Sequence, residues 1–214
     1  MRTYTGGEFG QNSYLAICAG SADAVVIDPG ATAPEIVHDI ERDRLNVRAI
    51  LITHAHLDHL QGVASVARRT GAVVALHPAD RALYDAAATQ AAMFGVALET
   101  PAAPERVLAH GERIQFGGCA LEVRHAPGHT PGHVILYSSA DQLAFVADVI
   151  FAGSIGRTDL PGGDYLQLMQ SIRQQVLTLP DETRLLPGHG PETTVGWERV
   201  GNPFLIPHYG GELA

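Results

Sequence analysis

Three histidines and one aspartate fall within six positions of one another in the stretch 53–62, THAHLDHLQG. Imidazole is a common metal ligand, and carboxylate suits the same metal ions. Residues two apart on an extended backbone point to the same side, so His54 and His56 can bind one ion together. Asp58 continues this alternation, and His59 follows it where a helix is expected to begin, so this second pair can hold another ion nearby. The stretch therefore predicts a metal centre.

Other residues that could bind a metal ion follow expected strands in the same way. The histidine stretch comes directly after an apolar run at 48–52 that is typical of a buried strand. Downstream, His129 lies in APGHTPGH, Asp148 follows the apolar run 143–147, and His189 lies in PGHG. A carboxylate that ends an apolar strand needs a partner. Because strand ends at one sheet edge converge in space, these side chains together predict one shared site, although each alone would be a weak signal.

The length of 214 residues allows one large domain or two small ones, and because no convincing domain boundary is present we expect a single domain covering residues 1–214. Hydrophobic residues make up 46% and charged residues 17% of the 214, which allows a large core and argues against disorder. The net charge of −9 argues against nucleic acid as a partner, because phosphate binding needs a basic surface. No apolar run approaches the roughly 20 residues of a membrane helix, and the first residues contain no signal-peptide core.

The two cysteines, Cys18 and Cys119, lie in apolar, strand-like surroundings. We expect both to be small buried hydrophobic residues rather than parts of a disulfide framework. Together with the composition, this favours a cytoplasmic location.

The expected elements form two successive halves, each running from strands to helix to strand. This order predicts two sheets packed face to face with helices on their outer faces, and the segment around Pro101 and Pro104 is interpreted as a connecting loop. Strands are expected at 13–19, 24–27, 48–52, 73–76, 113–116, 121–125, 134–138, 143–147 and 184–186, and helices at 35–44, 60–70, 79–88, 165–179 and 193–200.

The series THAHLDH, PGHTPGH, Asp148 and PGHG resembles the metallo-β-lactamase superfamily over essentially the whole chain, and the sequence DPG at 28–30 fits an early acidic motif of that family. Within the superfamily the chain is most similar to short, single-domain glyoxalase-II-type hydrolases, also called type II hydroxyacylglutathione hydrolases. This narrower similarity depends on QNSYL at 11–15, GRTD at 156–159 and NPF at 202–204. The resemblance implies an α/β fold, an αββα sandwich of two mixed sheets, with a dinuclear metal site at the sheet edge.

The resemblance also implies a role for each residue of the site. Two divalent ions, zinc in the first place with iron or manganese as alternatives, would share a hydroxide that attacks the substrate, with Asp58 and Asp148 as the catalytic carboxylates. Asp28 and His133 would lie beside the ions without binding them. The first ion would be held by His54, His56 and His129 and the second by Asp58, His59 and His189, with Asp148 bridging both.

The leaving group favours thioesters or lactones as substrates. A thiolate, whose thiol has a pKa of about 8.5, leaves without a proton, whereas the amine of a lactam needs one. The resemblance implies S-lactoylglutathione, which would give glutathione and D-lactate. Arg157 stands where the family carries a basic contact to glutathione, although it could equally be a surface arginine paired with Asp159. Longer relatives add a C-terminal helical domain that supplies much of the glutathione site, so a different small thioester stays open.

Three alternatives remain. A persulfide dioxygenase of the same superfamily would act on glutathione persulfide and hold one iron with the equivalents of His54, His129 and Asp148. A lactonase would use the same fold and metals. A non-enzymatic metal-binding module is disfavoured, because seven ligands shared by two ions leave room for a substrate. We expect a small-molecule partner and neither nucleic acid nor membrane, and the sequence gives no oligomeric state.

Overall fold

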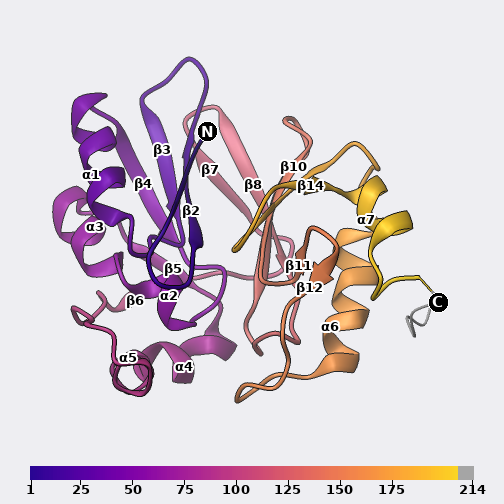
Figure 1. Cartoon of the computed structure of the whole chain (residues 1–214). Coiled ribbons are helices and arrows are strands. Elements are labelled where there is room, and N and C mark those ends of the chain that lie inside the picture. The colour runs from indigo at the N-terminus through magenta and orange to yellow at the C-terminus, as the bar shows by residue number, and fades with distance from the viewer. Residues whose placement is uncertain (207–214) are drawn as a thin grey trace.

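Two six-stranded sheets pack face to face in the computed structural model, which describes residues 1–206 (Figure 1). Helices cover the outer face of each sheet, on the left and on the right of the view. This is the αββα sandwich expected from the sequence, and that prediction is confirmed.

The first sheet contains its strands in chain order from β1 to β6. The first three pair antiparallel, whereas β3 to β6 run parallel. Parallel strands are covered on both faces, which explains why the last three residues of β4 (49–51) and all of β5 are apolar and buried. The strands are β1 (Arg2–Gly6), β2 (Gln11–Ile17), β3 (Asp23–Ile27), β4 (Asn46–Leu51), β5 (Val74–Leu76) and β6 (Pro104–Val107).

The second sheet has the strand order β14-β13-β10-β9-β8-β7. Its pairs are antiparallel except for β10 and β13, which run parallel. A two-stranded hairpin of β11 (Ile150–Phe151) and β12 (Ser154–Ile155) follows β10. The six strands are β7 (Arg113–Phe116), β8 (Cys119–His125), β9 (Val134–Ser138), β10 (Leu143–Ala147), β13 (Arg184–Pro187) and β14 (Thr193–Thr194).

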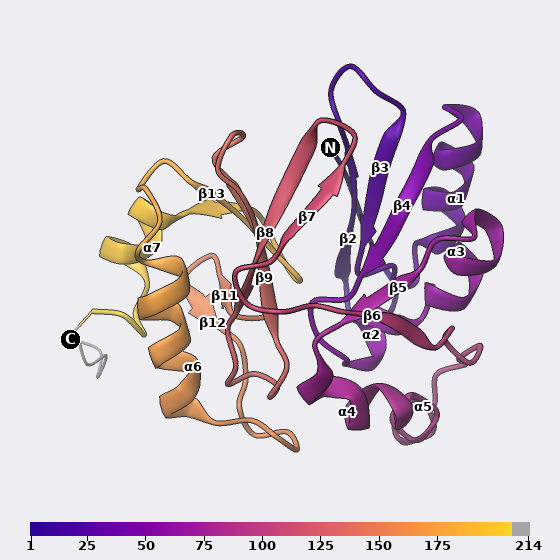
Figure 2. The ribbon, with the colours of Figure 1, turned by 180° about the vertical axis from the view of Figure 1, so that it is seen from behind.

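Three apolar clusters hold the four layers together. Tyr14 and Phe145 pack edge to face in the cluster between the sheets. Ile36 of α1 belongs to the cluster between the first sheet and its helices. Leu168 of α6 belongs to the cluster between the second sheet and the helices α6 and α7, which cover its outer face (Figure 2). No helix within residues 1–206 has the length and apolar character needed to cross a membrane. The helices are α1 (Ala33–Arg42), α2 (Leu57–Leu60), α3 (Val63–Thr70), α4 (Arg81–Asp85), α5 (Ala87–Phe94), α6 (Tyr165–Ser171) and α7 (Val195–Gly201).

Several boundaries differ from the sequence prediction. The segment read as a loop around Pro104 is the edge strand β6, whose first residue is that proline, a position where the missing N–H costs nothing. The strand β1 and the hairpin β11–β12 were not predicted, because they are short or lack an apolar run. The helix expected at 165–179 ends at Ser171 and continues as the wider π-type turn η2 (Ile172–Val176).

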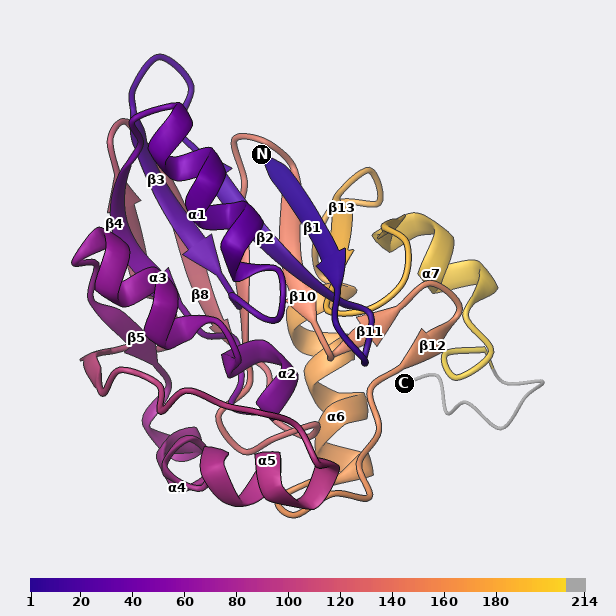
Figure 3. The same cartoon turned by 60° about the vertical axis from the view of Figure 1, so that its left-hand side comes forward.

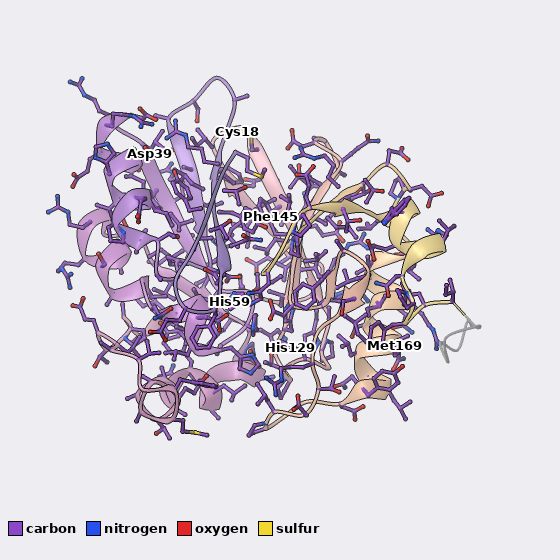
Figure 4. The ribbon with its side chains drawn as sticks, viewed as in Figure 1. Cys18, Asp39, His59, His129, Phe145 and Met169 are labelled. Carbon is purple, nitrogen blue, oxygen red and sulfur yellow. A yellow bond between two sulfur atoms is a disulfide. The ribbon has the colours of Figure 1, made fainter. Side chains whose placement is uncertain are left out.

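The prediction that the two cysteines are separate buried residues is wrong. Cys18, directly after β2, and Cys119, the first residue of β8, form a disulfide that joins the two sheets. Their Cα atoms are 5.6 Å apart. The sequence could not show that these two positions face each other across the sandwich. In Figure 4 Cys18 lies toward the end of the sheets away from His59 and His129.

Candidate metal centre

Polar side chains gather at one edge of the sandwich, where several strands end. The parallel strands β3 and β4 of the first sheet, and β10 and β13 of the second, place their carboxyl ends at this edge. The loop between β8 and β9 reaches it from the second sheet, and Figure 4 shows His59 and His129 close together there. Here the structure brings together the seven residues singled out in the sequence, which are His54, His56, Asp58, His59, His129, Asp148 and His189.

The first group consists of three imidazoles, His54, His56 and His129. One ring nitrogen from each lies within 4.8 Å of the others. Nδ1 of His56 is 2.9 Å from Nε2 of His129. Nε2 of His54 is buried and has no hydrogen-bond partner in the described part of the chain. Buried polar atoms are rarely left unpaired, and one cation between these three nitrogens would satisfy them.

The second group consists of Asp58, His59 and His189, whose ligand atoms also lie within 4.8 Å of one another. Oδ2 of Asp58 is 3.1 Å from Nε2 of His189 and 3.6 Å from Nε2 of His59. Nε2 of His59 is buried without a hydrogen-bond partner within residues 1–206. A second cation in this group would likewise pair a buried nitrogen that has no hydrogen-bond partner.

Asp148 lies between the two groups. Its Oδ2 is 3.5 Å from Nε2 of His129 in the first group and 3.5 Å from Nε2 of His189 in the second. Its Oδ1 is 3.5 Å from Nε2 of His59 and has no hydrogen-bond partner among the described residues. A carboxylate in this place can reach an ion in either group.

The ring nitrogens that face away from the centre are held by partners. Nδ1 of His59 is 3.0 Å from Oδ2 of Asp28. Nδ1 of His129 lies 2.7 Å from the carbonyl oxygen of Arg157, and Nδ1 of His189 lies 3.0 Å from the carbonyl oxygen of Phe9. Such contacts fix the orientation and tautomer of an imidazole and leave Nε2 free to bind.

Asp28 and His133 lie beside the two groups. The Asp28 carboxylate accepts hydrogen bonds from N and Oγ1 of Thr53, at 2.7 and 2.6 Å. It is also close enough to His54 and His59 for an ion, but both of its oxygens already have partners. The ring of His133 stacks on that of His54 at 4.7 Å, and its Nε2 accepts a hydrogen bond from N of Asp148.

Burial and charge set the ionisation of the site. Burial lowers the pKa of His54 well below its ordinary value and the pKa of His56 to about 4, so both rings are neutral at pH 7, as metal binding requires. Burial alone would also lower the pKa of His59, but the charges of Asp58 and Asp28 outweigh it and raise that pKa. The raised value reflects an excess of negative charge that a cation would neutralise.

Asp80, which the sequence analysis missed, connects the two loops that carry the first group. Its fully buried carboxylate, in the 3₁₀ turn η1 (Pro78–Asp80), accepts hydrogen bonds from N of Ala55 at 2.9 Å, Oγ1 of Thr130 at 2.8 Å and N of Gly132 at 2.5 Å. Ala55 lies between His54 and His56, and Thr130 follows His129. Its position shortly after β5 is the signal that could have found it, because β5 runs parallel to β4 and ends at the same edge.

Close packing around Asp148 and His59 also requires a glycine at position 188. A Cβ atom at Gly188 would lie 2.1 Å from Oδ1 of Asp148 and 2.9 Å from Cε1 of His59. Only a residue without a side chain lets the loop after β13 approach these ligands, and His189 follows directly.

A cleft of about 470 Å³ opens onto both groups. Candidate ligands including His56 and Asp148 form part of its lining, and most of the other lining side chains are apolar. Arg157 also lines it, but Nε and Nη2 of this residue each lie 2.7 Å from an oxygen of Asp159, and both side chains are more than half exposed. The arginine thus faces the cleft as part of a surface ion pair.

Comparison with known proteins gives matches over nearly the whole chain. Residues 6–189 match the family model described as the Metallo-beta-lactamase superfamily. A Haemophilus influenzae relative described as hydroxyacylglutathione hydrolase GloC is 38% identical over 199 residues, which cover 92% of this chain and 93% of the relative. The structure of TTHA1623 in a di-iron-bound form is 41% identical with a TM-score of 0.88, covering 96% of this chain and 100% of the other. The structure of the BLEG-1 B3 metallo-beta-lactamase is 35% identical with a TM-score of 0.89, covering 96% and 99%.

Proposed function

The chain belongs to the metallo-β-lactamase superfamily, and from this premise we propose that it hydrolyses small thioesters, S-lactoylglutathione first among them, with two divalent ions per chain. Membership supports a metal-dependent hydrolase as the general class. The thioester, the number of ions and the role of each residue are the proposal.

The observation that carries the proposal is the pair of three-ligand groups joined by one carboxylate. In our proposal His54, His56 and His129 hold one ion, and Asp148 reaches from it to the second. The ligand atoms of the second group, Asp58 with His59 and His189, also lie within 4.8 Å of one another. This supports a second ion, and metal content distinguishes our proposal from a persulfide dioxygenase with a single iron.

When bound, two divalent ions would supply an activated water and polarise the substrate carbonyl. The chain's own residues orient these partners. Asp58 lines the cleft, so its carboxylate would give one oxygen to the second ion and keep the other for a proton from the attacking water. The contacts of Asp28 and of the Phe9 and Arg157 carbonyls keep three of the five imidazoles, those of His59, His189 and His129, in the orientation that binding needs.

The relative described as a hydroxyacylglutathione hydrolase supports a glutathione thioester as the substrate. A thiolate leaves without a proton, so no general acid is required at the leaving group. We assign Arg157 to a carboxylate of the thiol portion, which would compete with Asp159 for the guanidinium.

The likeness to the BLEG-1 lactamase favours β-lactam hydrolysis as a second candidate. The amine leaving group of a lactam needs a proton, and Asp58, which lines the cleft with Asp148, could return one after it releases its ion. Comparing kcat/KM for a thioester and a β-lactam on the same preparation separates the two.

The test is metal analysis of the purified protein together with thiol release from S-lactoylglutathione. We expect two ions per chain, with their identity read from the same analysis, and loss of both hydrolysis and at least one ion in Asp148→Ala. Asp181→Ala is the matched control, because Asp181 is exposed on the surface and pairs only with Arg199 among the ion pairs described. One iron per chain with oxygen consumption on glutathione persulfide would refute the proposal, as would a β-lactam preferred over the thioester.

A further inference from the structure

The cleft over the metal centre has an apolar wall that hydrolysis itself does not require. Phe9, Leu83, Met93 and Phe94 line it on the side of the first sheet. Three of them expose much of their surface to water: 36% of Phe9, 78% of Met93 and 52% of Phe94. Apolar side chains gathered in this way at a cleft mark a place where an apolar group binds.

The two phenylalanines meet although they are far apart in sequence. Phe9 lies in the turn between β1 and β2, and Phe94 is the last residue of α5. Their rings pack edge to face with centroids 5.5 Å apart and planes at 86°. This is a favourable arrangement for two aromatic rings, so the wall has a defined shape before a ligand arrives.

Hydrogen bonds fix both sides of the wall to the metal centre. The carbonyl oxygen of Phe9 lies 3.0 Å from Nδ1 of His189. On the other side, Gln90 of α5 accepts a hydrogen bond from N of Leu57 at 3.1 Å and donates to the carbonyl of Ala55 at 3.0 Å. Figure 3 shows α5 directly below α2, the helix that carries Asp58 and His59. The wall therefore keeps a set position relative to the ligands.

Away from the metal centre, charge is scarce in the cleft. Arg157 is the one arginine in the described lining, and it is paired with Asp159. It lines the cleft together with Leu160 and Pro161, which follow it closely in the chain. Arg157 follows β12 on the side of the second sheet, so a thioester whose charged thiol portion lies there would leave the wall on the side of the first sheet for its acyl portion.

We propose that Phe9, Leu83, Met93 and Phe94 form an acyl subsite that selects thioesters with a bulky apolar acyl group. This inference rests on the proposed thioester hydrolysis. The phenylalanines supply a rigid face, and the unbranched side chain of Met93 adapts to the shape of the group. The difference between methyl and phenyl in an apolar pocket changes kcat/KM by about tenfold or more.

Two substrates that differ only in the acyl group test this. S-D-lactoylglutathione and S-D-mandeloylglutathione share the thiol and the α-hydroxyl, and a phenyl replaces the methyl. We expect the protein to prefer the mandeloyl thioester by about tenfold in kcat/KM. Phe94→Ala should remove this preference through a higher KM for the mandeloyl thioester alone, and Phe94→Leu should restore part of it. Leu166→Ala is the control, because Leu166 is 75% exposed on α6 and does not line the cleft.

Equal kcat/KM values for the two thioesters, or an equal loss for both in Phe94→Ala, would overturn the subsite. Binding of the free acids D-mandelate and D-lactate, measured by calorimetry, separates this failure from a failure of the proposed function. If neither thioester is hydrolysed, the function is wrong, yet tighter binding of mandelate that Phe94→Ala abolishes would still support the subsite. Equal binding of the two acids would overturn it.

Discussion

Replacing Asp80 with asparagine changes the support of the first ligand group without changing its ligands. Oδ2 of Asp80 accepts hydrogen bonds from N of Ala55 and Oγ1 of Thr130, and Oδ1 accepts one from N of Gly132. Asparagine offers one oxygen, so at least one of these donors would face an NH₂ group. A hydrogen bond to a charged group contributes about 1.5–3 kcal/mol, and an unpaired buried donor costs about 1–3 kcal/mol.

From these contributions, Asp80→Asn should lower the free energy of unfolding by about 3 kcal/mol. It should also weaken metal binding by roughly 10–100-fold, the usual effect of losing an outer partner of the ligands. Urea unfolding and competition with a chelator measure the two quantities. Asp85→Asn is the matched control: Asp85 is exposed and pairs with Arg81 at 2.8 Å, so both quantities should stay nearly constant. Metal affinity within twofold of the parent protein in Asp80→Asn would refute the positioning role.

Three further predictions follow from other contacts. Gly188→Ala should lower the metal-to-protein ratio after dialysis, because the new methyl would meet Oδ1 of Asp148 at 2.1 Å. Gly118→Ala is the control and should keep the ratio of the parent protein, because a methyl there meets nothing within 4 Å. Full metal content in both variants would contradict the prediction for Gly188. The double variant Cys18→Ser, Cys119→Ser should have a free energy of unfolding about 4–5 kcal/mol lower than the parent protein, since the disulfide closes a long loop. An unfolding free energy equal to that of the oxidised parent would contradict this prediction. Burial, together with the stacked ring of His125, lowers the pKa of His77 from 6.5 to about 4. Between pH 6.5 and pH 4 the unfolded state therefore binds more protons than the folded state, and the free energy of unfolding falls as the pH drops through this range. His77→Asn should flatten this pH dependence in urea unfolding, whereas His38→Asn, at an exposed position, should leave the slope as it is.

The gathering of the candidate ligands at one edge could be predicted from the sequence because their signal is local. His54 and His56 stand two apart after an apolar run, and Asp148 and His189 follow runs of the same kind. Strand ends at one sheet edge converge for any loop conformation, so the predicted strand positions were sufficient to predict that these side chains lie together. The sandwich followed from the same runs, because two halves of apolar strands with amphipathic helices have few ways to bury their faces.

What the sequence could not supply depends on contacts between distant segments. Asp80 is one acidic residue in HPADR, and only the fold shows that it meets the loops around Ala55 and Gly132. The edge strand β6 has no apolar run because it is covered less than its neighbours. The sequence separation of Cys18 and Cys119 does not predict a disulfide, since their pairing depends on which strands face each other across the core.

The disulfide gives the chain the covalent form of a ring with two tails. The ring spans a sequence separation of 101 residues between Cys18 and Cys119, and it carries the histidine stretch at 53–62, while His129, Asp148 and His189 lie on the C-terminal tail. A protease that cuts the exposed segment around Phe94 would open the ring without releasing a fragment. The nicked protein would run at full mass on a denaturing gel and split into two pieces only after reduction. Both groups of ligands would meanwhile stay on one covalent molecule, so a single cut at this place need not separate the two halves of the centre.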